Sequence, residues 1–227
     1  MLKTLTSFVF ILFISFSLFA QNACSKYYVF KEGVKFEMTT YNNKDKQTGI
    51  VKYEVKNVTG NTAILKNELF DAKGKSVMSS EFGLICDDKG ISIDFKSLMN
   101  NQVFEQFKEM DMDLDISGTN IQIPNNLSPG QTLPDAELIM TMSMASVTIK
   151  MEIKITNRKV VGNETISTSA GTFDCILITS DRELKMGMNR TISSKQWLAE
   201  GVGMVKSEEY DKKGNLVSKS ILTKFEM

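Results

Sequence analysis

The stretch VTIKMEIKI at residues 147–155 decides the fold class, because its apolar side chains fall at every second position without exception. A strand places alternate side chains on one face, whereas a helix would scatter them around its circumference. The same alternation recurs at residues 34–38, 51–55 and 91–95. The pattern predicts antiparallel strands with one apolar face and one solvated face.

Turn chemistry separates these predicted strands. Residues 71–74, 87–90 and 211–214 share the pattern Asp-x-Lys-Gly, in which Asp can hydrogen-bond its own backbone and Gly can adopt a positive φ. We expect a hairpin at each. The apolar positions change parity after Met144, which predicts a further turn or bulge at residues 144–146.

These strands, about ten or more, predict an all-β, mainly antiparallel single domain with a closed or half-open barrel-like form. A two-sheet sandwich is the alternative that the pattern does not separate from a barrel. One segment differs, since residues 97–110 place Leu98, Val103, Phe104 and Phe107 near helical spacing behind Ser97. A short helix is expected there.

The first 20 residues read as a secretory signal peptide, with Lys3 followed by an apolar stretch at residues 8–19. That stretch is shorter than the roughly 20 apolar residues of a spanning helix. The expected mature chain is one β-rich domain at residues 21–227 without a membrane span, in the periplasm, at the outer envelope or secreted. The alternative is cleavage after Ala23, which would leave Cys24 to carry lipid.

Composition excludes several functions. The chain has 227 residues, 27 basic and 27 acidic side chains and no histidine. Balanced charge argues against a nucleic-acid partner, and the lack of histidine removes Ser-His-Asp, Cys-His and imidazole-metal chemistry. We identify no catalytic motif, metal site or cofactor. An enzyme would need acidic groups such as Asp94, Asp111 or Glu200 to converge in a cleft.

The three cysteines, Cys24, Cys86 and Cys175, are far apart and form no Cys-x-x-Cys spacing. This fits an oxidising compartment. A Cys24–Cys86 disulfide would tie the mature N-terminus to the first strands. Cys175 lies in the apolar stretch 173–178 and is expected to be a small buried side chain.

Methionine is unusually frequent, with 14 residues in the chain. Met140, Met142, Met144 and Met151 are candidates to line a surface for an apolar or lipid-like ligand, because thioether side chains are flexible; ordinary core packing is the alternative. Trp197, the single tryptophan, is either a core anchor or a ligand-stacking residue.

Two functions follow from these candidates. The first is an exported, non-enzymatic β-domain that binds an apolar small molecule or lipid. The second is a structural or interaction module of the envelope or a secretion apparatus, with an envelope protein as partner. A carrier requires a cavity, whereas an interaction module should expose an apolar patch.

Three segments also support a resemblance. Residues 24–33, 169–175 and 197–208 resemble the TapB-like secreted family, formerly a domain of unknown function and common in Bacteroidota. The resemblance implies a secreted or envelope β-rich domain. It carries no catalytic residue over to this chain.

Overall fold

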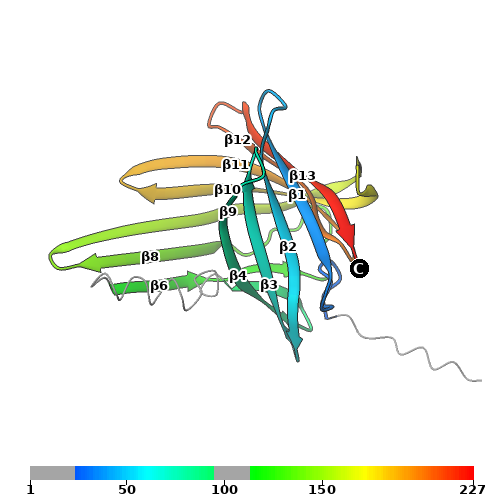
Figure 1. Ribbon diagram of the computed structural model, residues 1–227, viewed down its shortest axis with the longest axis horizontal. Coiled ribbons are helices and arrows are strands. Elements are labelled where there is room, and N and C mark those ends of the chain that lie inside the picture. The colour runs from blue at the N-terminus through cyan, green and yellow to red at the C-terminus, as the bar shows by residue number, and fades with distance from the viewer. Residues whose placement is uncertain (1–23, 95–112) are drawn as a thin grey trace, which may run out of the picture.

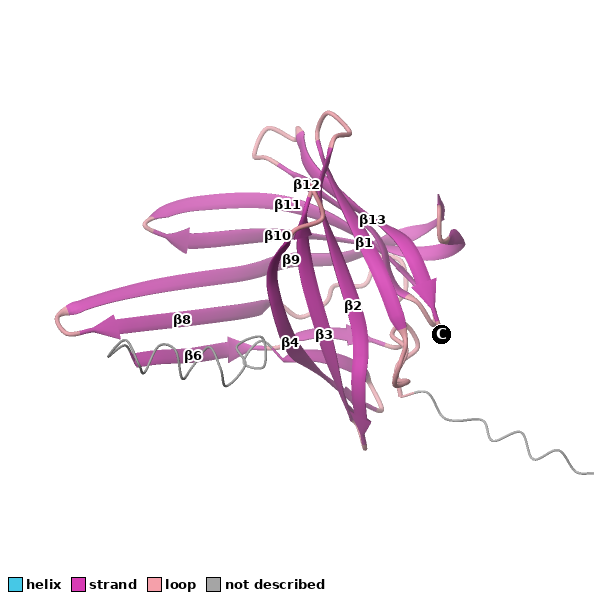
Figure 2. Ribbon diagram, viewed as in Figure 1, coloured by secondary structure: helices cyan, strands magenta, loops and turns pink. Residues whose placement is uncertain are grey.

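The computed structural model describes residues 24–94 and 113–227, which form one continuous antiparallel sheet of 13 strands (Figure 1). Its first five strands are β1 (Lys35–Asn42), β2 (Gln47–Thr59), β3 (Thr62–Asp71), β4 (Ser76–Asp87) and β5 (Gly90–Asp94). The others are β6 (Asp113–Thr119), β7 (Ile121–Pro124), β8 (Ala136–Met144), β9 (Val147–Thr168), β10 (Gly171–Met186), β11 (Met188–Ala199), β12 (Gly203–Tyr210) and β13 (Leu216–Glu226). Figure 2 shows only strands and loops in this part of the chain; the helix expected at 97–110 lies outside the described residues.

The predicted turns are present. The three Asp-x-Lys-Gly stretches form the β3–β4, β4–β5 and β12–β13 hairpins. In each, one Asp carboxylate oxygen accepts two backbone N–H bonds at 2.8–3.1 Å. Ala145 and Ser146 join β8 to β9, and Ala145 has a positive φ of 51°. The parity change after Met144 therefore marks a tight turn.

The sheet is ordered β6-β8-β9-β10-β11-β12-β13-β1-β2-β3-β4-β5-β7. The first and last strands of the chain pair in its middle, while β6 and β7 form its two ends. Only Asn120 separates β6 from β7 along the chain. Gly118 has a φ of +135°, and a Cβ atom there would lie 1.9 Å from the Glu137 carbonyl oxygen. Glycine thus permits the close approach of β6 to β8 just before the chain crosses to the other end.

A seam joins β9 to β7, the strand at one end of the sheet. Next to the start of β8, the connection between β7 and β8 runs alongside β9. Leu133 N donates a hydrogen bond to Arg158 O, and Val160 N donates one to Gln131 O, both at 2.9 Å. The buried Arg158 guanidinium then donates to Pro134 O at 2.7 Å and to Gln122 O of β7 at 2.9 Å. Burial lowers the pKa of Arg158 and Asp135 opposes that shift. The arginine therefore links β9 to the strand at the far end of the sheet.

The largest core cluster fills the barrel-like body. It joins side chains from β2, β3, β4, β5, β7, β9, β10 and β11, including Leu84, Val160 and Leu198. The N-terminal segment before β1 adds Tyr27 and Val34, with Tyr28, Val29 and Phe30 packed against them. This segment therefore acts as a plug. The fold confirms the all-β, closed or half-open barrel-like form expected from the sequence, here a nearly closed barrel, and the sandwich alternative is not adopted.

A second cluster lies against the other side of β10 and β11. Ile176 and Leu198 belong to the first cluster, whereas their neighbours Leu177 and Trp197 belong to the second. Ala170 and Phe173, from the β9–β10 turn region, also pack on the second cluster, and Ser169 Oγ donates to Thr223 O of β13 at 3.0 Å. These two strands are consequently buried on both faces, which explains the continuous apolar run at residues 175–178.

Two long hairpins, β8–β9 and β10–β11, project from this body on one side, with β6 alongside β8 (Figures 1 and 2). We call residues 113–119, 136–156 and 182–192 the arm, and the remaining described residues the body. The stretch 147–155 that defines the fold class lies in the arm.

Candidate functional site

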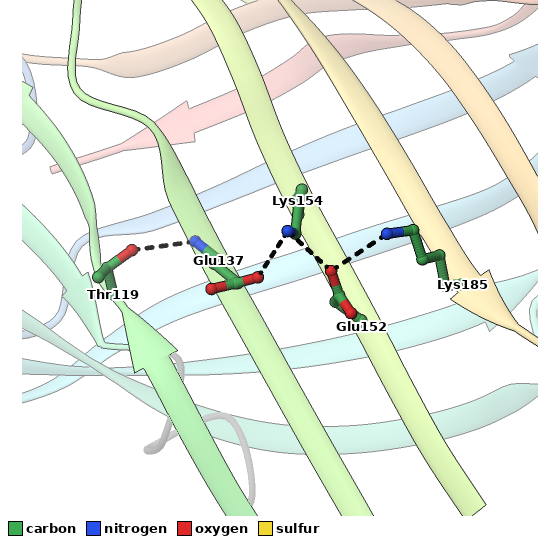
Figure 3. Close-up of polar contacts among 5 residues, drawn as sticks. All are labelled: Thr119, Glu137, Glu152, Lys154 and Lys185. Carbon is green, nitrogen blue, oxygen red and sulfur yellow. Dashed lines mark hydrogen bonds and ion pairs between the residues drawn. The ribbon is translucent and has the colours of Figure 1, made fainter.

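One face of the arm carries an ion-pair network across β8, β9 and β10, with a hydrogen bond to β6 beside it (Figure 3). Lys154 Nζ lies 3.2 Å from Glu137 Oε1 and 3.0 Å from Glu152 Oε1, and Lys185 Nζ approaches the same Glu152 oxygen at 3.4 Å. Thr119 Oγ1 accepts a hydrogen bond from Glu137 N at 3.0 Å. The hydrogen bond from Lys154 lowers the pKa of Glu152. Two acids thus neutralise two bases, which leaves this face solvated and locally balanced.

The opposite face of the arm is apolar and contains the methionines. Register places Met140 beside Met151 of β9 and Ile116 of β6. Met142 faces Ile149 across the same strand pair. A small cluster of buried residues holds Met140, and Met142 and Met151 pack against it. Met140, Met142 and Met151 therefore share one face of the arm; their role as ligand-lining residues stays a prediction.

Exposure on this face rises toward the hairpin tips. Ile116, Leu138 and Met140 are 9%, 7% and 6% exposed. At the tips, the exposed fractions are 47% for Met144, 55% for Val147, 46% for Ile149 and 54% for Met186. Met144 and Val147 pair directly at the end of β8–β9, and Met186 ends β10 on the other hairpin. The tips thus present large apolar side chains to solvent.

Three of these tip residues, Val147, Ile149 and Met186, were not singled out as site candidates from the sequence. Val147 and Ile149 look like core residues there because strand alternation is the same for a covered and an uncovered face. The signal that could have located them is the turn predicted at residues 144–146, since it places both near the end of a hairpin.

Trp197 lies apart from the methionines. It is buried in the second core cluster of the body, with its Nε1 donating to Glu164 Oε2 at 2.7 Å. The Lys206 ammonium lies 4.5 Å from the indole ring centroid. Trp197 is therefore part of the core of the body, and it does not lie on the methionine face of the arm.

The structure pairs Cys24 with Cys86 in a disulfide that spans 62 positions, with the two Cα atoms 5.8 Å apart. It joins the N-terminal plug to β4. Cys175 is free and buried in the second core cluster. Burial raises the pKa of the Cys175 thiol to about 11, and the carboxylates of Asp174 and Glu164 add to the shift. Such a thiol is a poor nucleophile near neutral pH.

A hollow of about 480 Å³ lies beside the plug and is lined by four charged side chains together with polar and apolar ones. Each acid on its wall has a partner: Glu164 accepts from Trp197, Asp174 accepts from Thr165 Oγ1 at 2.8 Å, and Glu200 pairs with Lys26 at 2.7 Å. A second hollow, of about 280 Å³, is lined by Lys and Glu side chains from β1, β2, β3 and β13 and by the stacked rings of Phe36 and Tyr53. Ligand cavities for apolar molecules are instead lined mainly by apolar side chains.

The described residues contain no candidate metal cluster, since no group of three acidic or cysteine side chains within them is placed to hold a metal ion. Of the acids considered for catalysis, Glu200 is an exposed ion-pair partner, while Asp111 lies outside the described residues and the side chain of Asp94 is not described. Across 24–94 and 113–227, no helix is long and apolar enough to cross a bilayer.

Comparison with known proteins supports the fold. A protein from Bacteroides fragilis NCTC 9343, described as exported and of YmcC-like fold, is 23% identical, covers 90% of this chain and 100% of its own, and superposes with a TM-score of 0.71. A protein from Parabacteroides distasonis ATCC 8503, described as a lipoprotein, is 20% identical, covers 89% and 99%, and gives a TM-score of 0.67.

The sequence comparisons define the family. No curated protein matches this chain. The narrower resemblance to TapB-like proteins stays a prediction. The DUF3108-like family profile matches residues 31–222, a range that extends from the plug to β13 and includes both body and arm. The chain belongs to the DUF3108-like family.

Proposed function

We propose that this protein is an exported, non-enzymatic module of the cell envelope that docks an apolar surface of another envelope protein with the tips of its arm. The observation that carries the proposal is the group of half-exposed tip residues, Met144, Val147, Ile149 and Met186. Contiguous exposed apolar side chains rimmed by polar groups are typical of interaction sites. The opposite face of the arm carries the ion-pair network, so the apolar side chains are confined to one face.

The packing of the body supports a docking surface over an internal carrier. Its main core cluster is filled by strand residues and by the N-terminal plug, and charged side chains stand in the walls of both hollows described above. Docking through a projecting arm requires no interior space. It also leaves the disulfide-linked body unchanged when the partner binds.

A lipid-like ligand remains the second candidate, because flexible Met142 and Met151 lie half-buried beside Met140. An acyl chain would then lie along the methionine face, since thioether side chains adapt to irregular apolar shapes. This candidate predicts a lipid bound to the purified protein, whereas the docking proposal predicts none.

The test places a photo-crosslinking amino acid at Val147 in the exporting cell, with Val77 of β4 as the matched control. Val77 is 62% exposed but lies on the body. We expect a discrete protein adduct from position 147 that Ile149→Asp abolishes, and no such adduct from position 77. Equal labelling at both positions, or none at 147, would contradict docking through the arm.

Native mass spectrometry of the gently purified protein tests the second candidate. Lipid released on denaturation from the wild type, but absent from Met142→Asp, would favour the lipid-like ligand. A protein free of lipid that still gives the adduct at 147 would favour docking to a protein.

A further inference from the structure

The Cys24 sulfur can carry a lipid or form a disulfide, and the two modifications exclude each other. In a bacterial lipoprotein, the mature N-terminal cysteine carries a lipid on its sulfur, which anchors the protein to a membrane. The Parabacteroides distasonis protein of similar fold is described as a lipoprotein. In this chain, the Cys24 sulfur is bonded to Cys86 of β4 instead. One sulfur atom cannot hold a thioether and a disulfide at the same time.

The backbone around Cys24 is fixed to the body by hydrogen bonds. Asn125, which follows β7, donates from Nδ2 to Cys24 O at 2.9 Å and accepts from Lys26 N at its Oδ1, 2.8 Å away. Gly201 N, from the β11–β12 turn, donates to Lys26 O at 2.9 Å. Residues 24–26 are thus bonded to three separate parts of the body: β4, the segment after β7, and the β11–β12 turn.

Two of the three side chains that follow Cys24 are buried, and Lys26 between them is exposed. Ser25 is 5% exposed and its Oγ accepts a hydrogen bond from Tyr28 N at 3.0 Å, while Tyr27 is 3% exposed within the main core cluster. In this chain, residue 24 already belongs to the folded domain.

We infer that Cys24 is a structural disulfide partner that locks the plug into the body, and that it is not an acyl acceptor. In forming the bond, the Cys24 and Cys86 thiols lose two protons and two electrons. The electrons reduce the disulfide of a thiol-exchange oxidant in the exported compartment to a dithiol. The inference concerns this sulfur alone and is independent of what the arm binds.

The experiment expresses the full chain in an exporting bacterium that acylates lipoproteins, fed with an alkyne fatty acid. Intact mass and the number of thiols alkylated in denaturant without reductant are measured for the wild type, Cys24→Ser, Cys86→Ser and the matched control Cys175→Ser. With three cysteines in the chain, we expect one alkylated thiol in the wild type, two in each disulfide variant and none in the control. None should carry the alkyne label.

Acyl mass on the wild type and on Cys86→Ser, lost only in Cys24→Ser, would overturn the inference. Three alkylated thiols in an unlabelled wild type would also overturn it, because Cys24 would then be free. If either disulfide variant fails to accumulate, the wild type and Cys175→Ser still decide the question, since their thiol counts and acyl mass need no disulfide variant.

Discussion

The body and the arm are built from the same alternating pattern, yet they differ in what lies on their apolar faces. Strand β9 passes through both. In the arm, its residues 147–150 are exposed on both faces, whereas Arg158 and Val160, in the body, are buried. Alternation sets which side chains share a face; only the elements packed on that face determine whether it becomes core. The arm therefore keeps an apolar face that the body would have covered.

The largest expected difference between the two regions is the cost of deleting an apolar side chain. Leu198→Ala removes a buried group of the main core cluster and should lower the free energy of unfolding by about 2–5 kcal/mol. Ile149→Ala, at the arm tip, should lower it by less than about 1 kcal/mol, because half of that side chain is already exposed. Urea unfolding monitored by circular dichroism measures both. Equal losses of unfolding free energy in the two variants would show that the arm tip is covered in solution, which would contradict the difference between arm and body.

A smaller effect is expected at the seam that closes the body. Arg158→Met removes two hydrogen bonds and leaves the Gln122 and Pro134 carbonyls without that donor, at a cost of about 1–3 kcal/mol. Lys159→Met changes an exposed neighbour and is the matched control.

Hydrogen exchange should locate the damage caused by Arg158→Met. The Leu133 and Val160 amides, which bond across the seam, should exchange faster, while amides of the β1–β2 pair stay protected. If exchange became faster by the same factor over the whole sheet, Arg158 would stabilise the entire fold and not only the seam.

The smallest effect concerns pH and the arm network. The pKa of Glu152 is lowered, chiefly by its hydrogen bond from Lys154, so its contribution to stability is present above the ordinary value of 4.5 and is lost as pH falls through the lowered value. Lys154→Met should move the Glu152 pKa back up, measured by NMR titration of its carboxyl carbon. Stability should hardly change, because salt and water screen exposed pairs. A large loss of stability would place this network among the interactions that hold the arm in shape.

Local features of this fold could be predicted from the sequence, because their causes are local. Strand faces follow from alternation, and the hairpins at Asp71, Asp87 and Asp211 follow from side-chain bonding to the nearby backbone. The grouping of Met140 with Met142 follows from the two-residue period of a strand. Each of these depends on residues within a few positions of one another.

Features set by long-range contacts could not be predicted in this way. Arg158 reads as one more charged residue on a solvated strand face, and its buried role depends on carbonyls 24 and 36 positions away. The separation of Trp197 from the methionines depends on which strand each occupies, because the second core cluster lies in the body. The exposure of Val147 and Ile149 depends on how far their hairpin extends beyond the body.

The pairing of β1 with β13 has a consequence for the timing of folding. Strands β1 to β5 pair in succession, as do β8 to β13, so each series can assemble as its residues become available. The outer edge of β1 has its partner only in residues 216–226, the last strand of the sheet. That edge stays open until residues 216–226 are available, and an open edge can pair with another chain. Completion of the sheet therefore waits for its final strand, whose contact with β1 has one of the largest sequence separations in the protein.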